Sequence, residues 1–168
     1  MTPAVLVLAL VTLQRLGELA LARRNTARLR EAGAVEVGAG HYPLVVAVHA
    51  AWLAGLWLLA PPLPPSLPWL AAFAVLQVLR VWVLASLGRR WTTRILVLPG
   101  APLVRRGPYR LMAHPNYAIV VGEIAVLPIA FGLYGYALVF SLLNAAILAI
   151  RIKAETDALA RFAGRHEA

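Results

Sequence analysis

Two groups of polar residues in the second half of the chain have types and spacing that suit chemistry on an anionic group. The run His114-Pro115-Asn116-Tyr117 directly precedes an apolar segment, and Arg151 and Glu155 follow at the end of the next one. Residues four apart share one face of a helix, and an arginine there can hold an oxyanion with two parallel hydrogen bonds. Each group alone is explained by a helix start or by an ordinary ion pair. Together, on adjacent antiparallel helices, they predict one wall of a pocket.

The residue types limit the reactions that such a pocket could support. The chain has no cysteine, which excludes a thiolate nucleophile, a disulfide and a cysteine-ligated metal. The sequence shows no Ser-His-Asp set and no convincing metal cluster, so we predict no metal site. An acceptor that is already anionic near neutral pH needs no strong base. Group transfer to an acidic oxygen therefore fits this set of residues.

The composition indicates a membrane protein. Of 168 residues, 61% are hydrophobic and 14% are charged, whereas a soluble domain has roughly half and about a quarter. The net charge of +9 could indicate nucleic-acid binding, but basic residues that flank apolar runs are typical of cytoplasmic membrane loops. We therefore predict no nucleic-acid partner. The length indicates one domain, residues 1–168.

Apolar segments of about 20 residues are long enough to cross a bilayer. They predict an all-α integral membrane bundle of about five transmembrane helices, with the last two helices and the loop before them forming a cytoplasmic pocket. The first segment lacks a preceding basic stretch, so we interpret it as a retained helix and not a signal peptide. A short interfacial helix is plausible between Arg23 and Gly40. The predicted spans are residues 2–22, 42–60, 67–87, 116–131 and 134–152.

Basic residues are distributed on one side of these segments. Every Lys and Arg except Arg15 and Arg80 falls after the first segment, after the third, or in the C-terminal tail. The turns at 61–65 and 132–135 contain none. The excess of positive charge in cytoplasmic loops predicts an N-terminus outside the membrane and a cytoplasmic active face.

Charged residues inside the spans need partners, because a lone charge in lipid is costly. Arg15 and Glu18 are three apart and are expected to pair with each other. Arg80 could extend its guanidinium towards the basic loop. Glu123 needs a partner on another helix or a bound proton, and a role in the site and a structural role are both open. Two uncharged residues are expected to form interhelical hydrogen bonds: His49 and Asn144.

The polar motifs, taken together, resemble a known family. Gly107-Pro108-Tyr109, His114-Pro115-Asn116-Tyr117 and Arg151-Ile152-Lys153-Ala154-Glu155 are similar to the C-terminal pattern of the isoprenylcysteine carboxyl methyltransferase family. The resemblance covers about residues 89–164. The N-terminal Arg15-Leu16-Gly17-Glu18-Leu19 and Gly40-His41-Tyr42 resemble a bacterial branch that is linked to type III polyketide synthases and methylates alkylpyrones. This branch implies a multi-pass protein of the bacterial plasma membrane.

The resemblance also implies a cofactor, S-adenosylmethionine, and an acceptor that is a lipophilic small molecule or a lipidated substrate in contact with membrane lipid. The implied cofactor region is residues 88–164. Arg151 matches an arginine that holds the substrate's acidic group. Arg94 matches a further cofactor contact loosely. The remaining cofactor-binding positions implied are Leu103, Val104, Tyr109, His114, Pro115, Asn116, Tyr117 and Glu155.

Three departures from the family pattern bear on specificity. Ala113 stands where an arginine is usual, Ile119 where a glycine is expected, and Thr156 where a second glutamate is expected. The first weakens an anionic contact, and the other two concern the substrate more than the cofactor. Alternatives remain open: a phospholipid N-methyltransferase, an NADPH-dependent membrane reductase of similar architecture, or a small membrane subunit whose basic face binds anionic lipid.

Overall fold

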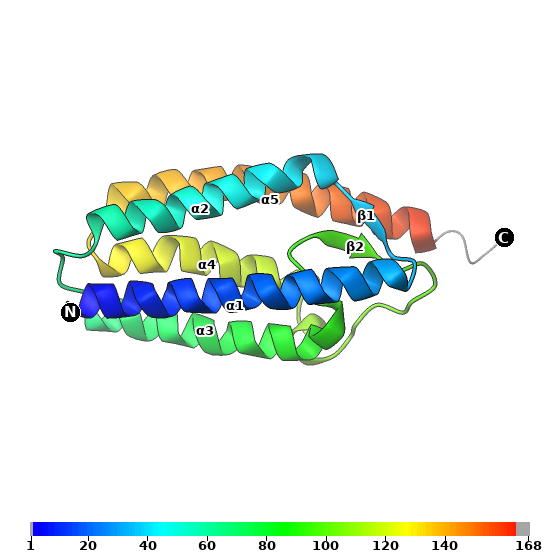
Figure 1. The fold of residues 1–168 in the computed structure, drawn as a ribbon, viewed down its shortest axis with the longest axis horizontal. Coiled ribbons are helices and arrows are strands. Elements are labelled where there is room, and N and C mark those ends of the chain that lie inside the picture. The colour runs from blue at the N-terminus through cyan, green and yellow to red at the C-terminus, as the bar shows by residue number, and fades with distance from the viewer. Residues whose placement is uncertain (1, 164–168) are drawn as a thin grey trace.

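A computed structural model describes residues 2–163 of the chain. The last predicted residue of the cofactor region, Gly164, lies outside the described residues. The α-helices of the described residues pack side by side in one bundle (Figure 1). They are α1 (Pro3–Glu31), α2 (Tyr42–Leu59), α3 (Leu67–Leu87), α4 (Pro115–Ala130) and α5 (Tyr134–Ala163). The predicted all-α membrane bundle is confirmed.

Prolines mark where four of these helices begin. Pro3, Pro43, Pro68 and Pro115 each lie in the first turn of a helix, where the missing N–H has no partner to lose. Thr2 caps α1, because its hydroxyl accepts a hydrogen bond from the Val5 amide. Helix starts are therefore encoded locally, and α4 begins at the residue after His114.

Helix lengths set the depth of the site. Within the described part of the chain, α1, α2, α3 and α5 are long and apolar enough to cross a membrane, while α4 is a shorter apolar helix of 16 residues. At about 1.5 Å per residue, α1 and α5 extend well beyond a bilayer core. Because α4 starts part-way along the bundle (Figure 1), its first turn lies between the longer neighbours.

Two helices run further than the hydropathy predicts. Helix α1 continues to Glu31, so the separate interfacial helix suggested between Arg23 and Gly40 is wrong. The segment from Ala20 to Arg30 is rich in Ala, Leu and Arg, which favour continuation of a helix. Helix α5 likewise continues past residue 152 to Ala163. Hydropathy marks where lipid contact ends, not where the backbone hydrogen bonds end.

A two-stranded antiparallel ribbon joins the two polar loops. Strands β1 (Val35–Val37) and β2 (Ile95–Val97) pair in the register Val35 with Val97. The ribbon contacts α5 and lies at the same end of the bundle as the C-terminal end of that helix (Figure 1). The amino-acid sequence does not predict this ribbon, since three-residue strands from distant loops leave little local pattern.

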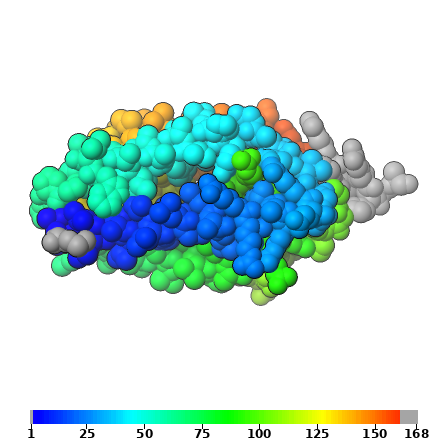
Figure 2. Space-filling view, viewed as in Figure 1, coloured from blue at the N-terminus to red at the C-terminus, as the bar shows by residue number. Residues whose placement is uncertain are grey.

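The buried core consists of two parts separated by polar residues. One apolar cluster joins the N-terminal half of α1 to α2 and α4, and includes Leu8, Leu56 and Leu127. The other includes Ala22, Val83, Trp91 and Ile119 near the ribbon. In the space-filling view, the surface is hollowed between α1 and α2, and deeper atoms show through (Figure 2). This hollow leads to the candidate site.

Candidate functional site

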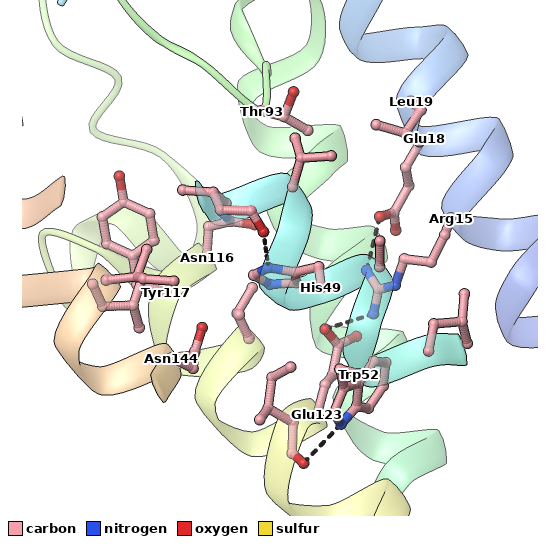
Figure 3. Close-up of a pocket in the computed structure, with 18 of the residues that line it drawn as sticks. Arg15, Glu18, Leu19, His49, Trp52, Thr93, Asn116, Tyr117, Glu123 and Asn144 are labelled. Atoms are coloured by element: carbon pink, nitrogen blue, oxygen red, sulfur yellow. Dashed lines mark hydrogen bonds and ion pairs between the residues drawn. The ribbon is translucent and has the colours of Figure 1, made fainter. Parts of the chain in front are cut away.

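A cavity of about 300 Å³ occupies the middle of the bundle. Most of its wall is apolar, with Leu16 and Leu19 on α1 and Val46 and Leu53 on α2. Residues that lie further in come from the loop before β2, from α4 and from α5, and several carry polar groups. Figure 3 shows polar side chains from several elements around this space. The combination of an apolar entrance and a few converging polar groups is typical of a site for a lipophilic ligand.

Tyr117 connects the cavity to the Glu155 carboxylate. Its hydroxyl donates to Glu155 Oε2 at 2.7 Å, and His114 Nδ1 lies 3.7 Å from the same oxygen. The rings of His114 and Tyr117 stack with centroids 5.3 Å apart. The predicted proximity of the His114–Tyr117 run to Glu155 is therefore present, and it links α4 to α5.

Arg151 does not form the i,i+4 pair with Glu155 that would explain it most simply. Its side chain is buried, with 6% exposed, and its Nη2 donates to the Thr93 carbonyl at 3.0 Å. The guanidinium lies 5.7 Å from the centre of the Tyr117 ring. Among residues 2–163 it has no carboxylate within salt-bridge distance. A buried guanidinium at a cavity wall without a counter-ion suits an anionic ligand.

Tyr109 and Asn116 lie near the start of α4 and have different surroundings. Tyr109 packs against the cluster of Val83 and Trp91. Burial, with a smaller effect from the Glu155 charge, raises the pKa of Tyr109 to about 12, so its hydroxyl stays a hydrogen-bond donor at neutral pH. Asn116 lines the cavity, and its buried Oδ1 has no hydrogen-bond partner among residues 2–163. Pro115 is buried in the first turn of the helix.

Two predicted cofactor residues lie elsewhere. Leu103 and Val104 line a separate hollow with Arg90, Arg105 and Arg106, and Leu103 is 61% exposed. A hydrogen bond fixes the start of this segment: Arg90 Nη1 donates to the Pro102 carbonyl at 2.6 Å. The structure does not bring these two residues to the cavity, and their cofactor role stays a prediction.

Arg94 forms an ion pair with the ribbon. Its Nη1 donates to Glu36 Oε1 at 2.5 Å, and its guanidinium lies 4.1 Å from the centre of the Tyr42 ring. Arg30 bonds the other oxygen of Glu36. The Tyr42 hydroxyl is 2.9 Å from Thr93 Oγ1, next to the carbonyl that holds Arg151. Arg94 therefore braces the backbone behind Arg151, and the loosely matched cofactor contact stays a prediction.

A four-residue ion cluster forms the inner wall of the cavity. Arg80 donates to Glu18 Oε1 at 2.5 Å and to Glu123 Oε2 at 2.8 Å, and Arg15 bonds Glu18 at 2.9 Å and Glu123 at 2.8 Å. Arg80 is 6% exposed, so the prediction that it extends towards the loop is wrong. Glu123 finds partners on two other helices. Two cations and two anions balance, which makes burial tolerable.

Two polar residues behave differently from prediction. His49 Nδ1 lies 2.8 Å from the Val45 carbonyl on its own helix, and Asn144 Oδ1 is buried without a hydrogen-bond partner in the part of the chain that the structure describes. Neither forms the expected interhelical hydrogen bond within the described chain. Both line the cavity instead, as do Trp91 and Thr93, for which the sequence predicts no role in the site. Their only signal was proximity in sequence to the basic loop or to a span.

Comparison with known proteins assigns a family to the part of the chain that contains these site residues. A model of the isoprenylcysteine carboxyl methyltransferase (ICMT) family matches residues 69–161. The chain belongs to this family. It is also 42% identical over 164 residues to the uncharacterized protein YpbQ of Bacillus subtilis (strain 168), a match that covers 94% of this chain and 96% of YpbQ. No solved structure matches.

Membership of the ICMT family makes the chain a multi-pass membrane methyltransferase. The family match begins in α3 and ends in α5, so it includes Tyr109, the α4 start, Arg151 and Glu155. The three departures from the family pattern lie outside the polar wall: Ala113 and Thr156 are exposed, and Ile119 packs in the second apolar cluster. Helices α1 and α2, which supply apolar residues of the cavity wall, precede the matched region.

Proposed function

We propose that this protein transfers a methyl group from S-adenosylmethionine to an acidic oxygen of a lipophilic acceptor, an isoprenylcysteine-type carboxylate or an alkylpyrone-type enol. The observation that carries the proposal is Arg151, a buried guanidinium at the wall of a largely apolar cavity that forms no ion pair with a carboxylate of the described residues. Arginine presents a bidentate grip to such an oxygen. The acceptor would then be held where its hydrocarbon part remains among apolar side chains.

The residues around Glu155 fit the proposed cofactor. S-adenosylmethionine would supply a methyl group on a positively charged sulfur. Glu155 could accept hydrogen bonds from ribose hydroxyls or an ammonium group, and the Tyr109 and Tyr117 hydroxyls are donors beside it. His114 and Pro115 complete this side by forming the start of α4.

Separate access for the two substrates is the physical reason for a membrane location. The hollow between α1 and α2 (Figure 2) is lined by leucine and valine, so an acceptor could enter from the lipid. A soluble cofactor would enter from the end that carries the basic loops. Arg151 would hold the acceptor oxygen in line with the transferred methyl, since displacement requires the reacting atoms ~3–3.5 Å apart. We place the active face in the cytoplasm of a bacterial plasma membrane, with the N-terminus outside.

Calorimetry on the purified protein in detergent tests the cofactor. S-adenosylmethionine should bind, and Glu155→Gln or His114→Ala should weaken it at least about tenfold, roughly 1.4 kcal/mol. Asp157→Asn is the matched control, since this carboxylate is exposed two residues along the same helix; it should leave binding unchanged. No binding to the wild type would overturn the proposal, and binding of NADPH in its place would favour a reductase.

Product analysis tests the acceptor. Membranes that contain the protein would be incubated with isotopically labelled S-adenosylmethionine, and lipid-soluble products identified by mass spectrometry. We expect the label on an oxygen. Label on an amine headgroup would replace the proposal with phospholipid N-methylation.

A further inference from the structure

A second hollow lies apart from the central cavity, where the loop between β2 and α4 meets the end of α3. It measures about 420 Å³, within the range of sites that hold small molecules. Three of its lining residues are arginines, Arg90, Arg105 and Arg106, and the others are apolar. A concave surface with this concentration of positive charge attracts anions.

The three arginines of this hollow have no acidic partners in the structure. Among residues 2–163, no carboxylate lies within salt-bridge distance of any of them. The nearby ribbon differs, because Arg94 and Arg30 both pair with Glu36 there. Like charges around one hollow repel one another, and an anion between them would remove that repulsion.

Two of the guanidinium groups are fixed in place by backbone carbonyls. Arg90 Nη1 donates to the Pro102 carbonyl at 2.6 Å, and Arg106 Nε donates to the Ser86 carbonyl, in the last turn of α3, at 2.7 Å. These bonds also hold the loop against the helix, which alone would explain one N–H of each side chain. A guanidinium has five N–H donors, so most of them are left for a ligand. Side chains that are already ordered lose less entropy when they bind.

The position of the hollow along α3 indicates a lipid and not a soluble anion. The 21 residues of α3 span about 30 Å at ~1.5 Å per residue, which is the thickness of the hydrocarbon core. Leu87, the last residue of this helix, lines the hollow, so the hollow lies at the level of the lipid headgroups. Leu103 in its wall is 61% exposed, and Leu111 and Met112 of the same loop are 79% and 49% exposed. Exposed apolar side chains beside arginines at a membrane boundary are typical of a surface that contacts lipid.

We propose that this hollow binds the phosphate group of an anionic phospholipid. Arg90, Arg105 and Arg106 hold the phosphate, and an acyl chain lies against Leu87 and Leu103. The three positive charges favour a headgroup such as phosphatidylglycerol over phosphatidylcholine, whose ammonium group they repel. The site is separate from the proposed methyl transfer and does not depend on it.

Native mass spectrometry of the full chain in detergent tests the proposal. The probes are dioleoyl-phosphatidylglycerol and dioleoyl-phosphatidylcholine, which differ only in the headgroup, and the fraction of protein with bound lipid is measured across a titration. We expect phosphatidylglycerol to bind at least about tenfold more tightly. Inorganic phosphate or S-adenosylmethionine at the same concentration as the lipid should not displace it. Displacement by either would assign the hollow to a soluble anion or to the cofactor and overturn the proposal.

Paired variants separate a site from general surface charge. Arg90→Gln with Arg105→Gln should remove the preference for phosphatidylglycerol, and Arg105→Gln alone, which keeps the bond from Arg90 to the loop, should reduce it at least about threefold. Arg89→Gln with Arg110→Gln is the matched control, because it removes the same charge from exposed arginines that do not line the hollow. This control should keep the preference. An equal loss in the two double variants, or no loss in Arg105→Gln, would show that no such site exists.

Thermal melts accompany each variant. If the Arg90 and Arg105 double variant has a lowered Tm, the comparison of Arg105→Gln with Arg110→Gln decides the result, because both positions are exposed.

Discussion

At the scale of single residues, the contacts of Arg151 fix its guanidinium at the cavity wall and leave its charge available to a ligand. Its guanidinium is fixed by the Thr93 carbonyl at 3.0 Å and lies above the Tyr117 ring, while Glu155, four residues on, bonds Tyr117 instead. The sequence spacing alone favours an ion pair between Arg151 and Glu155. In the structure the two side chains have different partners. We therefore expect substitutions of Arg151 and of Glu155 to affect different binding steps.

Arg151→Lys should reduce methyl transfer while leaving cofactor binding nearly unchanged. Lysine keeps the positive charge but lacks the planar guanidinium, which can donate two parallel hydrogen bonds to an oxyanion. We expect kcat/KM for the acceptor to fall about 100-fold, roughly 2.7 kcal/mol, and the S-adenosylmethionine Kd to change less than about threefold. The measurement is steady-state kinetics beside calorimetry. Equal loss of cofactor binding would show that Arg151 belongs to the cofactor side.

At the scale of elements, helix packing and the ribbon hold together the segments that line the cavity. Helices α2 and α5 approach closely at Gly55, where the Tyr136 hydroxyl donates to the Trp52 carbonyl at 2.7 Å. At the end of the bundle that carries the ribbon, Glu36 of β1 forms ion pairs with Arg94 and Arg30. The Tyr136 contact lies within the predicted membrane spans, and the Glu36 ion pairs lie outside them. Each can be tested by a single substitution.

Gly55→Ala should destabilise the α2–α5 contact. The added Cβ would lie 2.3 Å from the Tyr136 hydroxyl, so the ring would have to turn away and lose its hydrogen bond. We expect a loss of about 1–3 kcal/mol, measured as a lower Tm in detergent. Gly17→Ala is the matched control, because nothing lies within 4 Å of its added Cβ, and it should be neutral or slightly stabilising. An equal Tm for the two variants would contradict the close contact.

Glu36 should give the ribbon a stability that depends on pH. Partial burial acts to raise the pKa of Glu36, but hydrogen bonds from Arg94 and Arg30 outweigh it and hold the pKa below 4.5. A lowered acid pKa stabilises the fold above the unfolded value and loses that contribution as the pH falls through the folded value. The Tm difference between wild type and Glu36→Gln should be constant from pH 7 to about 5 and should shrink below 4.5. Thermal melts across this range measure it, and a difference independent of pH would contradict the ion pair.

At the scale of the whole molecule, the ion cluster joins three helices inside an otherwise apolar bundle. Glu18 of α1, Arg80 of α3 and Glu123 of α4 meet between the two apolar clusters, and Arg15 completes the charge balance. Figure 3 shows Arg15, Glu18 and Glu123 grouped at one side of the cavity. Because each charge depends on the others, the cluster fixes how the helices are rotated relative to one another.

Arg80→Leu should be among the most destabilising single changes in the chain. It leaves Glu18 and Glu123 buried with only Arg15 between them, and removal of one partner from a buried ion pair costs about 3–5 kcal/mol. The measurement is Tm or denaturant resistance in detergent. Arg110→Leu, at an exposed position, is the control and should change stability by less than about 0.5 kcal/mol. Similar stability of both variants would mean that the cluster is not structural.

The residues that the sequence placed well are those whose position follows from local rules. Pro115 starts α4 where a proline is favoured, and this puts His114 and Tyr117 at the helix mouth. Arg151 and Glu155 lie one turn apart at the same end of the bundle. Leu103 and Val104 follow no such rule, because they lie in a Gly- and Pro-rich loop whose path depends on what it packs against.

The sequence by itself determined the membrane bundle, the side that carries the basic loops, the helix starts and the family, since hydropathy, proline placement and motif spacing act over a few turns of chain. Only the tertiary structure decided that Arg80 pairs with Glu18 and Glu123, 62 and 43 residues away, and that β1 pairs with β2. It alone placed His49, Asn144 and Asn116 around one cavity. The physical reason is that such meetings depend on how each helix is rotated about its axis, and packing against all the other helices sets that rotation.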